Sequence, residues 1–386
     1  MEQENKSQQV DIQKKKNRKR TISNLVFLVL VSVLAILIVL QMGEISNISA
    51  AFSKIVEGSN YVWLIIAAVL TLLYFGLWPF SQCIFAKALK VKASIGESYL
   101  IGCSEHFYNG ITPFATGGQP FQIYSYTKRK VSTADATGVV LASFVTFMIV
   151  TNAFAIVSLF FWPNIWDGLV VLDKQSWIWV ALVGFVINFG VLLFMIALGV
   201  SKWLRNFLIK LLTKLAYAKM FHNEKHKLLN KFGNYLVKQI PVFTQYCENA
   251  QMAFKQVWNH KLASAFAFVV KIVDMACYYA IPFFLLKAVG FDVGWNQFVL
   301  VMFATSFSIT AVVWMPTPGG TLGIEYAFMI VIAAVLGQKA TDGSGAVVLL
   351  WRMLTFYLMI LMSFICNAIF EGVATHRMNK ENKDNV

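Results

Sequence analysis

The length of its apolar runs constrains this chain more than any other feature. The runs extend over Leu25–Met42, Tyr61–Phe85, Thr137–Phe161, Ile178–Val200, Lys261–Leu286 and Gly345–Phe370. A helix needs about 20 such residues to cross a hydrocarbon core about 30 Å thick. Hydrophobic residues make up 58% of the chain and charged residues 13%, which is more apolar surface than one soluble domain can bury. We therefore predict an all-α, polytopic integral membrane protein with about six full spans.

The basic residues lie between the apolar runs rather than on them. Despite a net charge of +14, the chain is therefore not expected to bind nucleic acid by itself. Lys and Arg gather in the N-terminal tail, at 128–130 and between 202 and 261, a distribution typical of cytoplasmic segments. This rule predicts that both termini are cytoplasmic. The first run is too long for the apolar core of a signal peptide, so we interpret it as a retained anchor.

Charge and hydropathy also predict the domain boundaries. We expect a basic cytoplasmic tail over 1–23, a transmembrane domain over 24–372 and a second cytoplasmic tail over 373–386. Residues 201–260 are predicted to be an amphipathic cytoplasmic connector, because leucines recur at helical spacing opposite a basic face from Lys202 to Phe221. This helix would lie on the anionic inner leaflet, and the rest of the connector is expected to be ordinary polar chain.

Two further apolar regions are interrupted by proline and glycine. Residues 95–126 contain NGITPFATGGQP, and residues 295–336 contain MPTPGGTLGIE. About eight residues remain in the second leg of the first region, which at 1.5 Å per residue cover only about 12 Å. We predict two re-entrant helical hairpins of opposite orientation, the first open to the cytoplasm and the second to the outside. The alternative is that each break is a tight turn between two full spans.

The two breaks share the order proline, then two adjacent glycines. Such a pair is the sequence trace expected of an inverted repeat, and it marks the transport site of many carriers. Irregular backbone at membrane depth must be satisfied by protein or water, so both breaks should line a cavity. Helices that restart near Pro120 and Gly323 would direct free amides toward the middle of the bilayer, where they can bind phosphate.

Ionisable residues within the apolar regions are the remaining site candidates. Lys271 and Asp274 lie three apart, so they form either a self-neutralising pair or a head-group contact. Arg352 either snorkels outward or binds phosphate with its planar fork. Glu325 follows the second break and favours the start of the next helix, or binds the ligand. The residues predicted to bind substrate are Glu105, Asn109, Pro113, Gly117, Gly118, Gln119, Lys271, Asp274, Pro316, Pro318, Gly319, Gly320, Glu325 and Arg352.

The sequence lacks the motifs of several catalytic classes. It contains no phosphate-binding GxxxxGK[ST] loop and no HExxH or CxxC pattern, so neither ATP hydrolysis nor a catalytic residue is predicted. His222 and His226 could share one helical face, but with no third ligand we interpret them as solvated and predict no metal site. No cofactor is expected either, and the five cysteines are not expected to form a disulfide framework.

Three strings carry a resemblance to a known family. TPFATGGQP at 112–120, PTPGGTLGIE at 316–325 and LLWRMLTFYL at 349–358 together resemble the lysylphosphatidylglycerol synthase/flippase transmembrane family. That family includes the membrane half of the bacterial multiple peptide resistance factor, and the likeness extends from Asn24 to Phe370. The resemblance implies a flippase-like fold in a bacterial cell membrane.

The resemblance also implies a function. We expect ATP-independent movement of an aminoacylated phospholipid, such as lysylphosphatidylglycerol, between leaflets, which would change surface charge and resistance to cationic peptides. Full-length relatives continue into a soluble aminoacyltransferase domain, whereas this sequence ends at Val386. Two alternatives stay open: a phosphatidylglycerol lysyltransferase, as the family name suggests, or a membrane subunit that partners a separate lipid-aminoacylating synthase.

Overall fold

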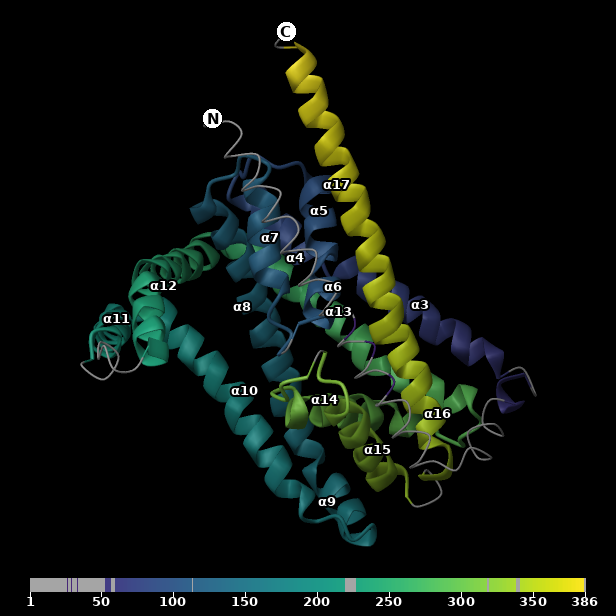
Figure 1. The fold of residues 1–386 in the computed structure, drawn as a ribbon. Coiled ribbons are helices and arrows are strands. Elements are labelled where there is room, and N and C mark those ends of the chain that lie inside the picture. Colours follow the sequence, from purple (N-terminus) through teal and green to yellow (C-terminus); the bar gives the residue numbers. More distant parts are fainter. Residues whose placement is uncertain are drawn as a thin grey trace.

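The fold is a bundle of long helices. The computed structural model describes residues 26, 29, 33, 53–56, 60–112, 114–218, 227–317, 319–337 and 341–384, and within these ranges there is no β-strand (Figure 1). Six helical segments of this part are long and apolar enough to cross a membrane: Tyr61–Ala88, Thr133–Val171, Trp177–Val200, Lys261–Ala288, Trp295–Val312 and Ser344–Gly372. The prediction of an all-α, polytopic membrane protein is confirmed.

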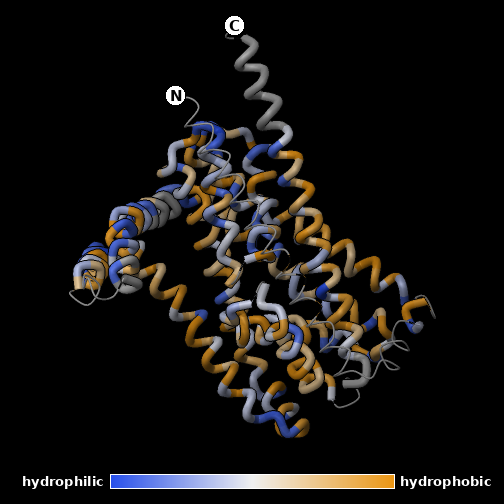
Figure 2. The backbone as a smooth tube through the Cα atoms, in the orientation of Figure 1, coloured by the Kyte–Doolittle hydropathy of each residue, from blue (hydrophilic) through white to orange (hydrophobic). Residues whose placement is uncertain are grey.

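Five of the six predicted runs coincide with these spans. The first run, Leu25–Met42, lies almost entirely outside the described residues. The sixth span instead comes from Trp295–Val312, the first leg of the second interrupted region. Figure 2 shows apolar residues along the helices α3 (Tyr61–Leu77) and α10 (Trp177–Val200).

Helix α13 (Lys261–Ala288) holds the bundle together. It packs against α3, α4 (Phe80–Ala88), α8 (Thr133–Ser158) and α14 (Phe298–Val312). The main apolar core joins α13, α14 and α15 (Gly323–Leu336) with parts of α9 (Trp162–Val171) and α10. Two charged residues of α13, Lys271 and Asp274, consequently lie buried inside the protein.

The first interrupted region has three short helices. These are α5 (Ile95–Cys103), α6 (Glu105–Gly110) and α7 (Gly118–Thr127). The ten residues of α7 cover about 15 Å, so the prediction of a short second leg holds for its length. Phe114 and Ala115 take left-handed backbone conformations between the legs. The interruption is therefore real, while its re-entrant course through a bilayer stays a prediction.

The second interrupted region is less symmetrical than predicted. A short 3-10 turn (Trp295–Gln297) leads into α14, and the two together form one of the six possible spans. Three of the four positions from 319 to 322 have positive φ, namely Gly319, Gly320 and Leu322, and the chain then becomes helical again at α15. The 14 residues of α15 cover about 21 Å. An opposite orientation of this hairpin also stays a prediction.

The last span contains a local change of helix type. α16 (Thr341–Arg352) runs into a π-helical turn over Met353–Tyr357, and α17 (Leu358–Asp384) continues from it. Single π turns inside α-helices are rare and occur often at functional sites. Arg352 is the last residue before this turn.

The connector differs from its prediction. α11 (Lys202–Ala216) is helical as expected, but the stretch predicted to be ordinary polar chain forms the 33-residue helix α12 (Lys227–Asn259), which packs against α8, α10 and α11. It contains Pro241, and because an internal proline usually ends a helix, the sequence does not indicate this one. His222 and His226 lie outside the described residues.

Labelling of cysteines at two exposed positions tests the topology. In a cysteine-free background, Lys128→Cys at the end of α7 should resist a membrane-impermeant thiol reagent in intact cells, because the basic cluster is predicted to be cytoplasmic. Asp167→Cys in α9 is exposed and should react. Labelling of position 128 from outside would mean that the first interrupted region crosses the membrane completely.

Candidate functional site

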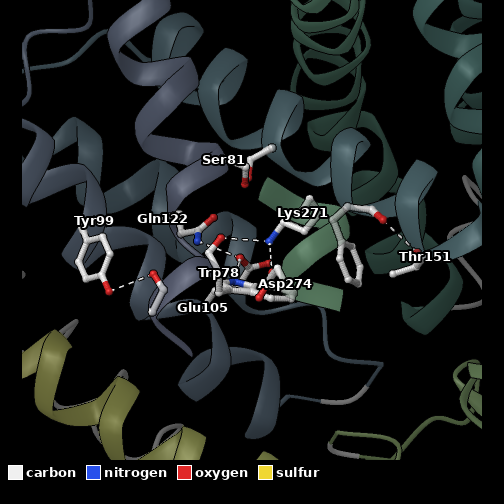
Figure 3. A network of polar contacts seen from close by, with 11 residues as sticks. Trp78, Ser81, Tyr99, Glu105, Gln122, Thr151, Lys271 and Asp274 are labelled. Carbon is white, nitrogen blue, oxygen red and sulfur yellow. Dashed lines mark hydrogen bonds and ion pairs between the residues drawn. The ribbon is translucent and has the colours of Figure 1, made fainter. Parts of the chain in front are cut away.

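Trp78 lies at the centre of a buried polar network between α3 and α4. Its indole Nε1 donates a 3.0 Å hydrogen bond to Oε2 of Glu105, and its carbonyl oxygen accepts a 3.1 Å hydrogen bond from Nζ of Lys271. The same Nζ lies 4.0 Å from the centre of the indole ring, a cation–π distance. Figure 3 shows Glu105, Trp78, Lys271 and Asp274 as one cluster. Trp78 therefore connects the first break to the charged pair of α13.

Lys271 and Asp274 form a fully buried ion pair. Nζ of Lys271 lies 2.8 Å from Oδ2 of Asp274, and the two residues are 1% and 0% exposed. Within the described chain, Oδ1 of Asp274 has no hydrogen-bond partner. The pair neutralises itself, as one of the two sequence interpretations expects, but it also retains an acceptor that is not used.

Glu105 organises the first break. Besides the bond from Trp78, its carboxylate accepts hydrogen bonds from the side-chain amides of Asn109 (3.4 Å), Gln119 (3.0 Å) and Gln122 (3.2 Å). These donors come from α6 and from the first turn of α7 and the turn that follows. The carboxylate thus fastens the restarted helix to the helix that precedes the break.

The amides at the start of α7 are bonded within the break itself. The amide of Gly117 donates to Oγ1 of Thr112 at 2.9 Å, and that of Gly118 donates to Oδ1 of Asn109 at 2.8 Å. Their predicted contact with a phosphate would require these bonds to be exchanged. The fit is tight, because a Cβ at Gly118 would lie 2.6 Å from Cγ of Glu105. Pro113, also predicted here, lies outside the described residues.

Arg352 binds the second break. Its Nε lies 2.7 Å from Oε1 of Glu325 in a buried ion pair, while Nη2 donates to Oγ1 of Thr321 at 3.2 Å and to the carbonyl oxygen of Gly319 at 3.4 Å. The guanidinium also stacks on Phe356, 4.1 Å from the ring centre. In the part of the chain that the structure describes, Oε2 of Glu325 is buried and has no hydrogen-bond partner. Arg352 is thus held by the break and does not snorkel outward.

The two breaks meet at one cavity. Its volume is about 150 Å³, and it is lined by His106 and Asn109 from the first break, Gly319 and Ile324 from the second, and Arg352. Both breaks line a cavity, as predicted. A cavity of this size has room for several water molecules. It can hold a head-group fragment such as a phosphate, but not a whole phospholipid.

The other predicted residues are distributed around this cavity. Four predicted charged residues do not line the cavity: Glu105, Lys271, Asp274 and Glu325. They belong to the hydrogen-bond and ion-pair networks behind its walls. Gly320 is buried and Pro316 is exposed, while Pro318 lies outside the described residues. Sequence reasoning missed Trp78, and it missed Tyr74 and Phe356, which line the cavity. The only sequence signal near Trp78 is the adjacent Pro79, which interrupts the span.

The fold and this site define a class: polytopic α-helical membrane proteins with a small polar cavity between two helix breaks. Within that class, the chain belongs to the family described as the lysylphosphatidylglycerol synthase TM region, which matches residues 24–363. The resemblance noted in the sequence is therefore confirmed. The chain is also similar to a UPF0104 membrane protein of Archaeoglobus fulgidus, with 23% identity over 317 residues, covering 79% of this chain and 85% of the relative.

Replacement of Gly319 by alanine tests the geometry of the second break. A Cβ at this position would lie 2.1 Å from a ring atom of Phe356, and its φ is +60°. We expect Gly319→Ala to lower stability by about 1 to 3 kcal/mol through overpacking and backbone strain, measured by thermal unfolding in detergent. Gly372→Ala is the control, because a Cβ there meets no atom of the described residues within 4 Å. An unchanged melting temperature for Gly319→Ala would contradict the geometry.

Glu105→Gln tests the carboxylate at the first break. The new amide nitrogen would replace one carboxylate oxygen and direct its donors toward two of the four existing donors, so we expect a loss of about 1 to 3 kcal/mol in stability. Glu371→Gln is a matched control, because the ion pair of Glu371 with Lys128 is solvent-exposed and is worth only about 0 to 1 kcal/mol. Equal melting temperatures for the two variants would show that the hydrogen bonds of Glu105 do not stabilise the fold.

Proposed function

We propose that this protein moves an aminoacylated phospholipid, such as lysylphosphatidylglycerol, between the two leaflets without hydrolysing ATP. The observation that carries the proposal is the position of Arg352 on a cavity bordered by both helix breaks. Family membership supports a lipid with this head group. The sequence has no phosphate-binding loop, so transport without ATP hydrolysis fits this multi-pass membrane protein better than transport driven by ATP.

The chemistry of the site fits a head group that carries both phosphate and amine. Guanidinium is the side chain best suited to hold two phosphate oxygens at once. In the structure its charge is balanced by Glu325. A phosphate that binds Arg352 would take the place of this carboxylate, which then becomes available to an ammonium group. Glu325 and Asp274 lie behind the residues that line the cavity, and each has one unused oxygen that would become a further acceptor for that amine once its side chain turns toward the cavity.

Measurement of lipid exchange between leaflets, with the purified protein reconstituted in liposomes, tests the proposal against its alternatives. Leaflet exchange of a labelled lysylphosphatidylglycerol without charged tRNA supports a flippase. Formation of lysyl-lipid from phosphatidylglycerol and charged tRNA would instead support a lysyltransferase. If neither occurs, and a synthase co-purifies with the chain, the protein is a membrane subunit for that synthase and the flippase proposal fails.

Two substitutions separate the phosphate contact from the amine contact. Arg352→Lys keeps the charge but loses the fork, so exchange of phosphatidylglycerol and of its lysyl form should both weaken. Asp274→Asn should affect only the lysyl form, since phosphatidylglycerol has no ammonium group. The loss of one charge-assisted contact of about 1.5 to 3 kcal/mol corresponds to roughly ten- to hundredfold in affinity.

Asp274→Asn also leaves Lys271 unpaired, so stability must be controlled. Lys271→Met and the double variant complete a mutant cycle that isolates the pair. If a folded Asp274→Asn protein loses exchange of both lipids equally, Asp274 has no role in amine recognition and forms only a structural pair.

A further inference from the structure

A long apolar groove runs along α10, on a part of the protein that the polar site does not use. Its volume is about 820 Å³, and all of its lining residues are apolar. Ala181, Phe185 and Phe307 form a buried floor, while Leu182 and Val186 form an exposed edge. The groove is therefore open along its side, and in a membrane this side faces lipid.

The groove extends farther than one leaflet. Its residues on α10 recur at helical spacing from Ile178 to Leu193, and these 15 steps of 1.5 Å correspond to about 22 Å. One leaflet of a hydrocarbon core about 30 Å thick accounts for about 15 Å. Because α10 spans the membrane, the groove offers a continuous apolar surface that passes the midplane.

Helix α14 links the groove to the second break. Phe307 of α14 packs against Phe185, with 5.1 Å between the ring centres. One turn further along α14, the backbone of Ala311 lies directly against Gly184 of α10. A Cβ at Gly184 would lie 2.0 Å from the carbonyl oxygen of Ala311. α14 ends at Val312, and the break that follows contributes Gly319 to the polar cavity. One helix therefore borders the groove and leads directly to the cavity.

We propose that the groove holds one acyl chain of the lipid whose head group passes through the polar cavity. This inference rests on the proposed function and assigns the second half of the substrate. The occupant must be apolar, elongated and present in the bilayer, and a lipid tail meets all three conditions. A tail that changes leaflet needs an apolar surface on both sides of the midplane, which a groove confined to one leaflet would not supply.

Photolabelling tests the occupant directly. The full-length protein is reconstituted in phosphatidylglycerol vesicles with a trace of phosphatidylglycerol that carries a diazirine in its acyl chain, and labelled residues are mapped by mass spectrometry. We expect stronger labelling of the groove face of α10, for example at Val186, than of Val183 and Val191, which are exposed outside the groove. Equal labelling around α10 would show ordinary surrounding lipid and overturn the assignment.

A pair of adjacent substitutions tests whether the groove contributes to movement. Gly190 lines the groove, and a Cβ there meets no described atom within 4 Å, so Gly190→Trp fills the groove without a backbone clash. Val191→Trp adds the same ring outside it. Exchange should slow by about fivefold or more in Gly190→Trp, the lower end of what overfilling an occupied site costs, and should stay near wild type in Val191→Trp.

The two measurements fail in different ways. If wild-type protein exchanges no lipid, the proposed function is wrong, while the labelling pattern still shows whether a chain occupies the groove. If wild-type protein exchanges lipid and Gly190→Trp, shown to be folded by its melting temperature, exchanges it as fast as Val191→Trp, the acyl-chain assignment is wrong and the head-group proposal stands.

Discussion

Backbone groups at membrane depth need partners from the protein itself, since lipid offers none. Both helix breaks of this structure satisfy the requirement, but by different means. The first uses two neutral side chains next to it, Thr112 and Asn109, of which Asn109 also donates to the carboxylate of Glu105. The second uses a cation from another helix, because Arg352 binds the carbonyl oxygen of Gly319. Arg352 thus gives the cavity its positive charge and also satisfies a backbone carbonyl oxygen of the break.

This double use of Arg352 limits how a ligand can enter. Under the proposed function, an anion that binds the guanidinium would compete with Glu325 and with the loop at the same time. Its binding would therefore be coupled to the shape of the second break. The first break is linked to the charged pair of α13 through Trp78. The indole of Trp78 bonds Glu105, and its carbonyl oxygen bonds Lys271. Paired charges on both sides keep the desolvation cost of the site tolerable.

Much of the fold follows from the sequence because span length and helix breaks are local properties. Five apolar runs match observed spans, and helices restart at Gly118 and Gly323, close to the predicted positions. The contacts of the site are not local. Trp78 and Glu105, which form a hydrogen bond, lie 27 residues apart in the sequence. Phe107 and Ser363, which form another, lie 256 residues apart. No periodicity encodes such pairs. The helix α12 was missed for another reason, because an internal proline usually ends a helix.

The π turn after Arg352 has a consequence for how the last span tolerates change in length. A π turn accommodates more residues per turn than an α-helix, so the segment Met353–Tyr357 contains slack that the rest of the helix lacks. Removal of one residue from an ordinary α-helix rotates everything beyond it by about 100°. Removal of one residue inside this turn would convert it to α-helix and keep Ser363, which bonds to Cys103, on its present face. The last span can thus lose one residue at this turn and still keep its contacts with the interior of the protein.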